Sequence, residues 1–342
     1  ILKILGLDIG GANLKICELD TEKKKYLCKF YHLPLWVKGL DGVKEVLRKM
    51  NSFDYVSVTM TGELSDYFRT KREGVKKICE MVIEIFNKDK VYFLNNRFQL
   101  LNFNEIDDLL TLAGANWCST SWFVSKLEKD ILLIDVGSTT TDIIPIKDHR
   151  PIPQGFTDDE RLSYGELIYT GALRTNLCSI VSKVPFRGRE VRVSSELFAL
   201  SGDIHLILGN IKEEDYTTET ADKRGKNFKD SLNRVAHLIC LDESLVTEEE
   251  IIHICKYIYQ RQLDQIKEGI LQVLSRVKLN KFMVCGLGKD FLAKRALEQL
   301  GFNNIKDLSD LIGYYASLTA PSFCICFMLL DKLGGLKGWF NF

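Results

Sequence analysis

The chain has 342 residues, of which 46% are apolar and 27% are charged, and its 46 basic side chains balance its 46 acidic ones. A net charge of zero argues against a general nucleic-acid-binding protein, whose domain would be basic. The length exceeds what one hydrophobic core usually serves, so we expect two domains.

The ten cysteines lie mostly in apolar runs without a Cys-x-x-Cys, and the five histidines form no His-Glu-x-x-His. We therefore expect reduced cysteines in the core of a cytoplasmic protein, and no transition-metal site. The longest late apolar stretch, APSFCICFMLL, is shorter than the roughly 20 residues of a membrane-spanning helix. We expect no interaction with a membrane.

Hydrophobic periodicity predicts alternating strands and helices in the first part of the chain. The expected strands are LKILGLDIG, NLKICELD, KKYLCKFYHL, DYVSVTMTGEL and KVYFLN. The expected helices lie at 41–50, 71–87 and about 105–127.

The strand pattern starts again at residue 131. Strands are expected at 131–136, 141–148 and 281–285, and a polar loop or flap at 211–228. Helices are expected at 158–176, 194–209, 229–241, 247–277, 289–300 and 313–332. This alternation predicts the α/β class, with a first domain of residues 1–130 plus the C-terminal helix 313–342 and a second domain of residues 131–312.

Two segments of the chain repeat each other. ILGLDIGGANLKICEL and LLIDVGSTTTDIIPI superpose without a gap, so that Asp8 aligns with Asp135 and Gly10 with Gly137. Each is an apolar strand, then Asp-x-Gly, then small residues, then a second strand. Backbone N–H groups and hydroxyls in such a turn bind phosphate oxygens, whereas the aspartate suits a Mg²⁺ ion held through water. A tight hairpin capped by its aspartate explains either segment alone, but explains two copies poorly.

The doubled arrangement resembles the actin/Hsp70/sugar-kinase superfamily over most of the chain. The resemblance implies two similar, ribonuclease H-like domains that face each other across a cleft, with the repeats as the phosphate 1 and phosphate 2 turns. FMVCGLGKDFLAKRAL, with Gly286 and Gly288, is similar to the adenosine motif, although an ordinary turn explains that pair equally well. The first turn, Gly11-Ala12-Asn13, lacks the hydroxyl usual in kinases of the superfamily.

A narrower resemblance rests on longer strings. TGEL at 61–64 resembles hydantoinase/oxoprolinase-like proteins. Strings such as SYGELIYTGALRTNLCSI, VSSELFALSGDIHLILGNI and TADKRGKNFKDSLNRVAHLICLD are similar to the tetrahydromethanopterin-linked C1-transfer proteins. The archaeal branch of that family is similar to an enzyme of methanofuran biosynthesis. The resemblance implies a transferase that joins 5-(aminomethyl)furan-3-ylmethyl diphosphate to the phenol oxygen of γ-glutamyltyramine and releases diphosphate.

The same resemblance implies roles for individual residues. Asp8 and Asp135 would hold Mg²⁺ through water, and Asp142 would either join them or cap its turn. Lys15 would neutralise the diphosphate, unless it is a solvated strand lysine. Residues expected to bind substrate or diphosphate are Gly10, Gly11, Asn13, Thr61, Gly62, Gly137, Ser138, Thr139, Thr140, Arg161 and Gly286, with Arg174 as a further candidate.

Other functions stay open on the sequence. An ATP-dependent kinase or an oxoprolinase-like hydrolase is the first alternative, with Glu63 and Asp66 as candidates for its base. A nucleotide-sensing protein that opens and closes without turnover is the second. A homodimer is plausible on base rates alone.

Overall fold

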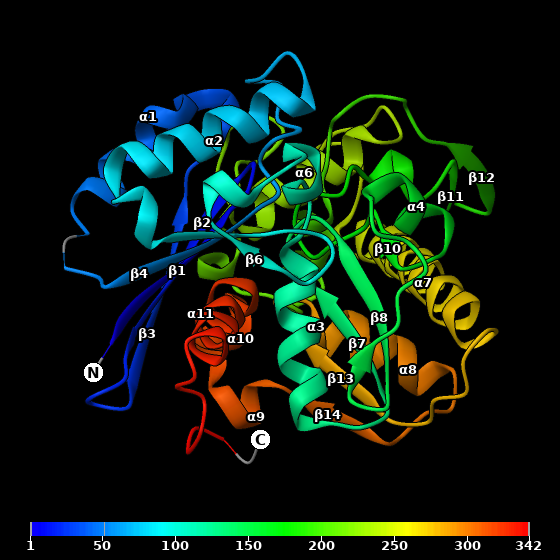
Figure 1. Ribbon diagram of the computed structural model, residues 1–342. Helices are drawn as coiled ribbons and strands as arrows, with labels where there is room; N and C mark the ends of the chain where they lie inside the picture. Colours follow the sequence, from blue (N-terminus) through cyan, green and yellow to red (C-terminus); the bar gives the residue numbers. More distant parts are fainter. Residues whose placement is uncertain (1, 51, 341–342) are drawn as a thin grey trace. The chain divides into compact units, whose positions relative to one another are not determined.

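The computed structural model describes residues 2–50 and 52–340 (Figure 1). The first sheet has the strand order β3-β2-β1-β4-β5-β6. Its strands are β1 (Lys3–Ile9), β2 (Asn13–Asp20), β3 (Lys25–His32), β4 (Tyr55–Met60), β5 (Val91–Leu94) and β6 (Leu100–Leu101). β1 pairs antiparallel with β2 and parallel with β4. Because β1 is a central strand, it is buried from Ile4 to Ile9, which explains its continuous apolar sequence.

The second sheet repeats the order of the first. Its strands run β10-β8-β7-β13-β14, with β9 beside β8. They are β7 (Ile131–Val136), β8 (Thr141–Lys147), β9 (Arg150–Pro151), β10 (Leu167–Ile168), β13 (Phe282–Cys285) and β14 (Ile305–Asp307). β7 and β8 take the places of β1 and β2, and β13 takes the place of β4. The shared order confirms the predicted α/β class and the duplication. A separate hairpin joins β11 (Lys183–Phe186) to β12 (Arg189–Arg192).

Helices cover the first sheet. They are α1 (Leu35–Arg48), α2 (Lys71–Ile85), α3 (Asn116–Leu127), α10 (Tyr314–Leu318) and α11 (Ala320–Lys332), with the short α9 (Ser309–Ile312). Leu5, Leu7 and Ile9 of β1 share a core with α1 and α2. Gly6, one position along, instead faces α11, since a Cβ there would lie 2.1 Å from the Ser322 carbonyl oxygen. The strand therefore buries both faces.

Further helices lie along the chain between the strands of the second sheet. They are α5 (Ser201–Ile207), α6 (Phe228–His237), α7 (Glu248–Leu274) and α8 (Arg295–Gln299), the last continuing a π-helical turn at Lys289–Lys294. α7 begins with a capping box in which Thr247 and Glu250 satisfy each other's backbone N–H groups. It packs closely on the second sheet, because a Cβ at Gly269 would lie 2.6 Å from Ile168.

Several predicted helices are shorter or absent. Residues 158–176 contain only α4 (Asp158–Ser163), which ends before Gly165 at φ +69°, then β10 and an irregular segment. Residues 194–209 contain only α5. Residues 105–127 contain only α3, because Gly114 at φ +59° prevents a continuous helix. Short 3₁₀ turns lie at Lys88–Lys90, Phe103–Glu105, Leu109–Leu112, Leu177–Ser179 and Glu213–Asp215.

Contacts divide the chain into two compact units. The first comprises the chain up to residue 133, residues 144–163 and the chain from residue 307 onward; the second comprises residues 134–143 and 164–306. Residues 144–163, which the sequence analysis placed in the second domain, contact the first unit. Within this segment Asp158 pairs with Lys71 at 3.4 Å, and the Phe156 carbonyl accepts from the Asn96 amide at 3.0 Å.

The ten cysteines are thiols and not halves of disulfides, and most are buried as predicted. Cys28 and Cys178 are half-buried, and Cys240 is exposed rather than in the core. Among the described helices, none combines the length and the apolar character needed to cross a bilayer.

Candidate functional site

The first turn joins β1 to β2. Its closing hydrogen bond runs from the Gly10 N–H to the Asn13 carbonyl at 2.9 Å. The Thr61 and Gly62 N–H groups both donate to the Ile9 carbonyl at 3.0 Å. A Cβ at Gly62 would lie 3.1 Å from the Gly10 backbone. The structure therefore places Gly10, Asn13, Thr61 and Gly62 next to one another. Their role in binding stays a prediction.

The predicted metal ligand of this turn has a partner in its own hairpin. Asp8 lies directly opposite Lys15 in the strand register, and the Lys15 Nζ is 3.7 Å from the Asp8 Oδ2. The Asp8 side chain is only 3% exposed. Its carboxylate is therefore buried beside a cation, and Lys15 is not a purely solvated lysine.

The second turn joins β7 to β8 and closes in the same way, with the Gly137 N–H donating to the Thr140 carbonyl at 3.0 Å. Gly137, Ser138, Thr139 and Thr140 are all half-exposed. The Ser138 and Thr139 hydroxyl oxygens are 3.4 Å apart. This turn presents neighbouring hydroxyls that solvent can reach.

A segment far along the chain cradles the second turn. The N–H of Ala172 donates to the Gly137 carbonyl at 2.9 Å, and the N–H groups of Leu173 and Arg174 donate to the Ser138 carbonyl at the same distance. A Cβ at Gly171 would lie 2.6 Å from the Thr139 backbone. The sequence analysis missed this contact because it predicted a helix here.

Asp135 lies against the turn that follows β13. Gly286 has φ +86°, and a Cβ there would lie 2.5 Å from the Asp135 Oδ1 and 2.4 Å from the Val136 carbonyl oxygen. The Gly288 N–H donates to that same carbonyl at 2.9 Å. Asp135 is half-exposed, unlike Asp8. The structure thus joins Asp135, the second turn and Gly286 in one place.

The two arginines singled out in the sequence have different surroundings. The Arg174 Nη1 donates to the Thr139 Oγ1 at 3.1 Å. Arg161 is 2% exposed within the first unit, and its guanidinium carbon stacks 4.4 Å from the centre of the Trp117 ring. Burial of this kind is typical of a structural arginine, so substrate binding by Arg161 stays a prediction.

A buried polar chain supports the segment that cradles the second turn. The Gln262 side-chain amide donates to the Gly171 carbonyl at 2.8 Å and to the Thr170 hydroxyl at 3.0 Å. The Gln262 Oε1 is 2.8 Å from the His205 Nε2. Burial lowers the pKa of His205 to about 4, so its imidazole is neutral. The one feature of the sequence that could have predicted this support is a glutamine, Gln262, on the buried face of α7.

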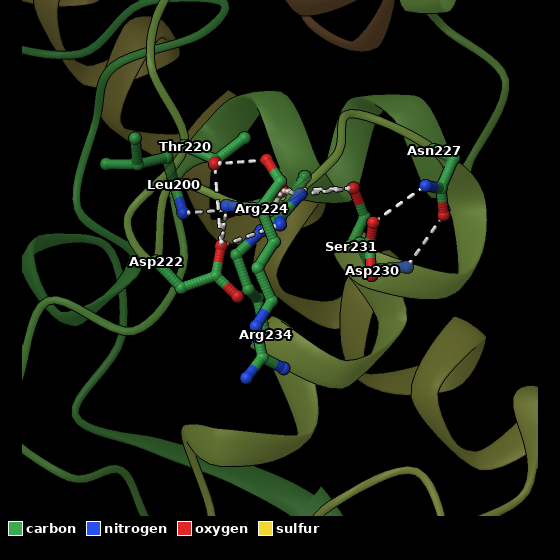
Figure 2. Close-up of polar contacts among 9 residues, drawn as sticks. Leu200, Thr220, Asp222, Arg224, Asn227, Asp230, Ser231 and Arg234 are labelled. Atoms are coloured by element: carbon green, nitrogen blue, oxygen red, sulfur yellow. Dashed lines mark hydrogen bonds and ion pairs between the residues drawn. The ribbon is translucent and has the colours of Figure 1, made fainter.

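A buried ion cluster joins α5 and α6 (Figure 2). The Arg234 Nη2 is 2.8 Å from the Asp203 Oδ1, and both side chains are 0% exposed. Arg234 also contacts Asp222 at 3.0 Å, which ties the segment 211–228 to α6. Desolvation raises the pKa of Asp203 and Arg234 opposes that rise. The Gly202 N–H donates to the Leu173 carbonyl at 3.1 Å, so the helix of Asp203 adjoins the segment beside the second turn.

Glu63 is a buried acid next to the first turn. It is 1% exposed, and within the described residues its Oε2 has no hydrogen-bond partner. Desolvation raises its pKa to about 7, and Asp158 reinforces the rise. This was one of the two candidate bases; the other, Asp66, is exposed.

The donor groups of the site suit a metal ion that is held by only a few side chains. The described residues contain no group of three or more His, Cys, Asp or Glu side chains that could enclose an ion. Mg²⁺ does not need such an enclosure, because it is usually bound by one or two carboxylates together with substrate phosphates. The half-exposed Asp135 and Asp142, on adjacent strands of one hairpin, fit that mode.

Comparisons with known proteins agree with this description. The model of the hydantoinase/oxoprolinase family matches residues 54–324. A protein of Methanocaldococcus jannaschii named (4-{4-[2-(γ-L-glutamylamino)ethyl]phenoxymethyl}furan-2-yl)methanamine synthase is 38% identical over 97% of this chain and 99% of its own length. A protein of the same name from Methanococcus vannielii is 38% identical over 62% of this chain and 96% of its own length.

A solved structure shows the same fold. Acetone carboxylase in its nucleotide-free form superposes with a TM-score of 0.57 at 8% identity, over 95% of this chain and 70% of its own. At that identity the likeness concerns the fold alone.

Proposed function

The chain belongs to the hydantoinase/oxoprolinase family, and from this premise we propose that it is the synthase that joins 5-(aminomethyl)furan-3-ylmethyl diphosphate to the phenol oxygen of γ-glutamyltyramine. The observation that carries the proposal is 38% identity to a synthase named for the resulting ether, over 97% of this chain. The half-exposed second turn, with its hydroxyls and Asp135, supports the same reaction because it suits a diphosphate group.

The reaction is a displacement at the CH₂ group that carries the diphosphate. The phenol oxygen forms a C–O bond to that carbon, the bond from carbon to the diphosphate oxygen breaks, and its electron pair leaves with the diphosphate. The phenol proton passes to solvent or to a base. The electron-rich furan stabilises positive charge developing on the CH₂ group, so the nucleophile needs little activation.

The chain's own part in this reaction is to hold the leaving group. Ser138, Thr139 and Thr140 donate hydroxyl hydrogen bonds to diphosphate oxygens, and donors aimed at developing charge lower the barrier. Mg²⁺, when bound by Asp135 and Asp142 with the diphosphate, supplies neutralising charge. The expectation that Asp8 and Lys15 act on the same diphosphate stays a prediction.

The decisive experiment combines the purified protein with Mg²⁺ and the two substrates, and measures diphosphate and ether without ATP. Formation of both in equal amounts is the expected result. Product that appears only with ATP would contradict the proposal and favour the kinase-like or hydrolase-like alternative. ATP binding without any turnover of the substrates would contradict it in favour of a nucleotide sensor. A reaction without the protein controls for uncatalysed coupling.

A further inference from the structure

We propose that Arg174 binds the departing diphosphate directly, as the cationic group of the second turn. The inference rests on the proposed function, because it names a residue that takes up the charge of that reaction's leaving group. Arg174 would donate hydrogen bonds to diphosphate oxygens while the bond between carbon and oxygen breaks, without transferring a proton.

Both the backbone and the side chain of Arg174 are attached to this turn. Its N–H donates to the Ser138 carbonyl at 2.9 Å, and its Nη1 donates to the Thr139 Oγ1 at 3.1 Å. The guanidinium therefore lies beside the hydroxyls that suit phosphate oxygens. A phosphate bound by the Thr139 hydroxyl would lie within reach of the same guanidinium.

The segment that carries Arg174 is firmly supported. The Gly171 N–H donates to the Thr175 Oγ1 at 2.8 Å, and the Thr175 N–H donates to the Ser201 Oγ at 3.1 Å. Gln262 satisfies the Gly171 carbonyl at 2.8 Å. These bonds are buried, so the segment before and after Arg174 is held from the interior. A donor placed in advance costs little reorganisation when charge develops.

The electrostatics favour an anion at this point. Arg174 is half-buried, and desolvation lowers the pKa of its guanidinium. The group nevertheless stays charged at neutral pH. A cation that has lost part of its hydration is stabilised by a bound anion. Arginine suits diphosphate in particular, because its planar fork can contact two phosphate oxygens at once.

The test compares Arg174→Gln and Arg174→Lys with the wild type and with a matched control, Arg261→Gln. Arg261 is an exposed arginine of α7 that pairs with Asp264 three residues along. Isothermal titration with inorganic diphosphate and Mg²⁺ gives the affinity, and the coupling reaction gives kcat/KM. Circular dichroism and thermal melts establish that each variant is folded.

Arg174→Gln should weaken diphosphate binding and lower kcat/KM by roughly 10- to 100-fold, the range for hydrogen bonds to charged groups. Arg174→Lys should recover part of the loss, because a point charge remains without the fork. Arg261→Gln should match the wild type. An unchanged melting temperature with weakened binding distinguishes direct contact from a structural role.

The outcomes separate this inference from the proposed function. A folded Arg174→Gln variant with wild-type diphosphate affinity and kcat/KM would overturn the role of Arg174 while leaving the synthase intact. If Arg174→Gln does not fold, Arg174→Met takes its place, and wild-type affinity and kcat/KM in that uncharged variant would overturn the role. If the wild type forms no ether but binds diphosphate, and Arg174→Gln does not, the diphosphate site stands and the synthase proposal fails.

Discussion

The two duplicated turns share a backbone and differ in what surrounds their aspartates. In both, the N–H of the glycine after Asp-x donates to a carbonyl three residues on, at 2.9 Å in the first turn and 3.0 Å in the second. Asp8 is 3% exposed and 3.7 Å from Lys15, whereas Asp135 is half-exposed and the position of Lys15 is taken by Asp142. The first turn has Gly11, Ala12 and Asn13 where the second has three hydroxyl residues.

The two copies therefore keep the same hairpin backbone, but they differ in the binding properties of their side chains. A carboxylate buried beside a lysine is already neutralised, so it has less to offer a cation. A half-exposed carboxylate beside hydroxyls suits a hydrated Mg²⁺ and phosphate oxygens. We therefore expect the second turn to carry more of the binding energy for diphosphate.

The largest effect should come from the aspartates themselves. Asp135→Asn should lower kcat by roughly 10³-fold, because removal of a group that stabilises developing charge costs two to three orders of magnitude. Asp8→Asn should lower kcat less, since its carboxylate is already paired with Lys15. Steady-state kinetics at saturating Mg²⁺ measures both, with circular dichroism as the control for folding. Equal losses in the two variants would break the distinction between the turns.

The support of the second turn can also be weakened by substitution in the buried ion cluster of Asp203 and Arg234. Arg234→Met should reduce the free energy of unfolding by about 3–5 kcal/mol, because it strands the buried Asp203 carboxylate. The double variant Asp203→Leu with Arg234→Met should recover part of that loss. Urea denaturation measures the stability. Hydrogen exchange should quicken at residues 171–175 and stay unchanged at residues 10–13; uniform quickening would argue against a local link.

The glycine beside Asp135 provides a finer test. Gly286→Ala should lower kcat roughly 100-fold, because a Cβ would displace the Asp135 carboxylate and misplacement by about 1 Å has that cost. Gly301→Ala is the matched control: Gly301 has φ +83°, close to the +86° of Gly286, but nothing lies within 4 Å of its Cβ position. A similar loss of activity in both variants would point to backbone strain instead of steric displacement.

The smallest effect concerns the acid beside the first turn. Because the folded-state pKa of Glu63 is about 7, above the ordinary 4.5, the folded protein binds the extra proton between these values. Its stability therefore falls as pH rises through that interval and levels off above pH 7. As pH rises from 5 to 8, the free energy of unfolding of Glu63→Gln should increase by about 1–2 kcal/mol relative to that of the wild type.

Thermal or urea denaturation at the two pH values measures this gain. We also expect Glu63→Gln to have the same kcat as the wild type at pH 8. A stability difference that does not change with pH would contradict the burial of an ionisable Glu63. A large loss of kcat in Glu63→Gln would instead make the first turn a participant in proton transfer, and would weaken the contrast between the turns.

Local patterns in the sequence predicted the scaffold of the site well. The Asp-x-Gly repeats gave two hairpins of the same strand order, because continuous apolar runs ending at small residues favour buried strands and tight turns. The long helix from about 247 was predicted, and Thr247 and Glu250 cap it. The segment 169–176 was wrongly predicted as helix, since its apolar spacing resembles one turn of an amphipathic helix.

The duplication, the two turns and the residue types in them follow from local sequence alone, because each lies within fewer than twenty consecutive residues. The burial of one aspartate, the position of the Arg174 side chain and the contacts that support it depend on how the chain packs in three dimensions. Those features depend on hydrogen bonds between segments that are distant in the chain, such as Arg174 to Thr139 and Gln262 to Gly171. Such bonds leave no period or spacing in the sequence, since a backbone carbonyl accepts from any donor that folding brings to it.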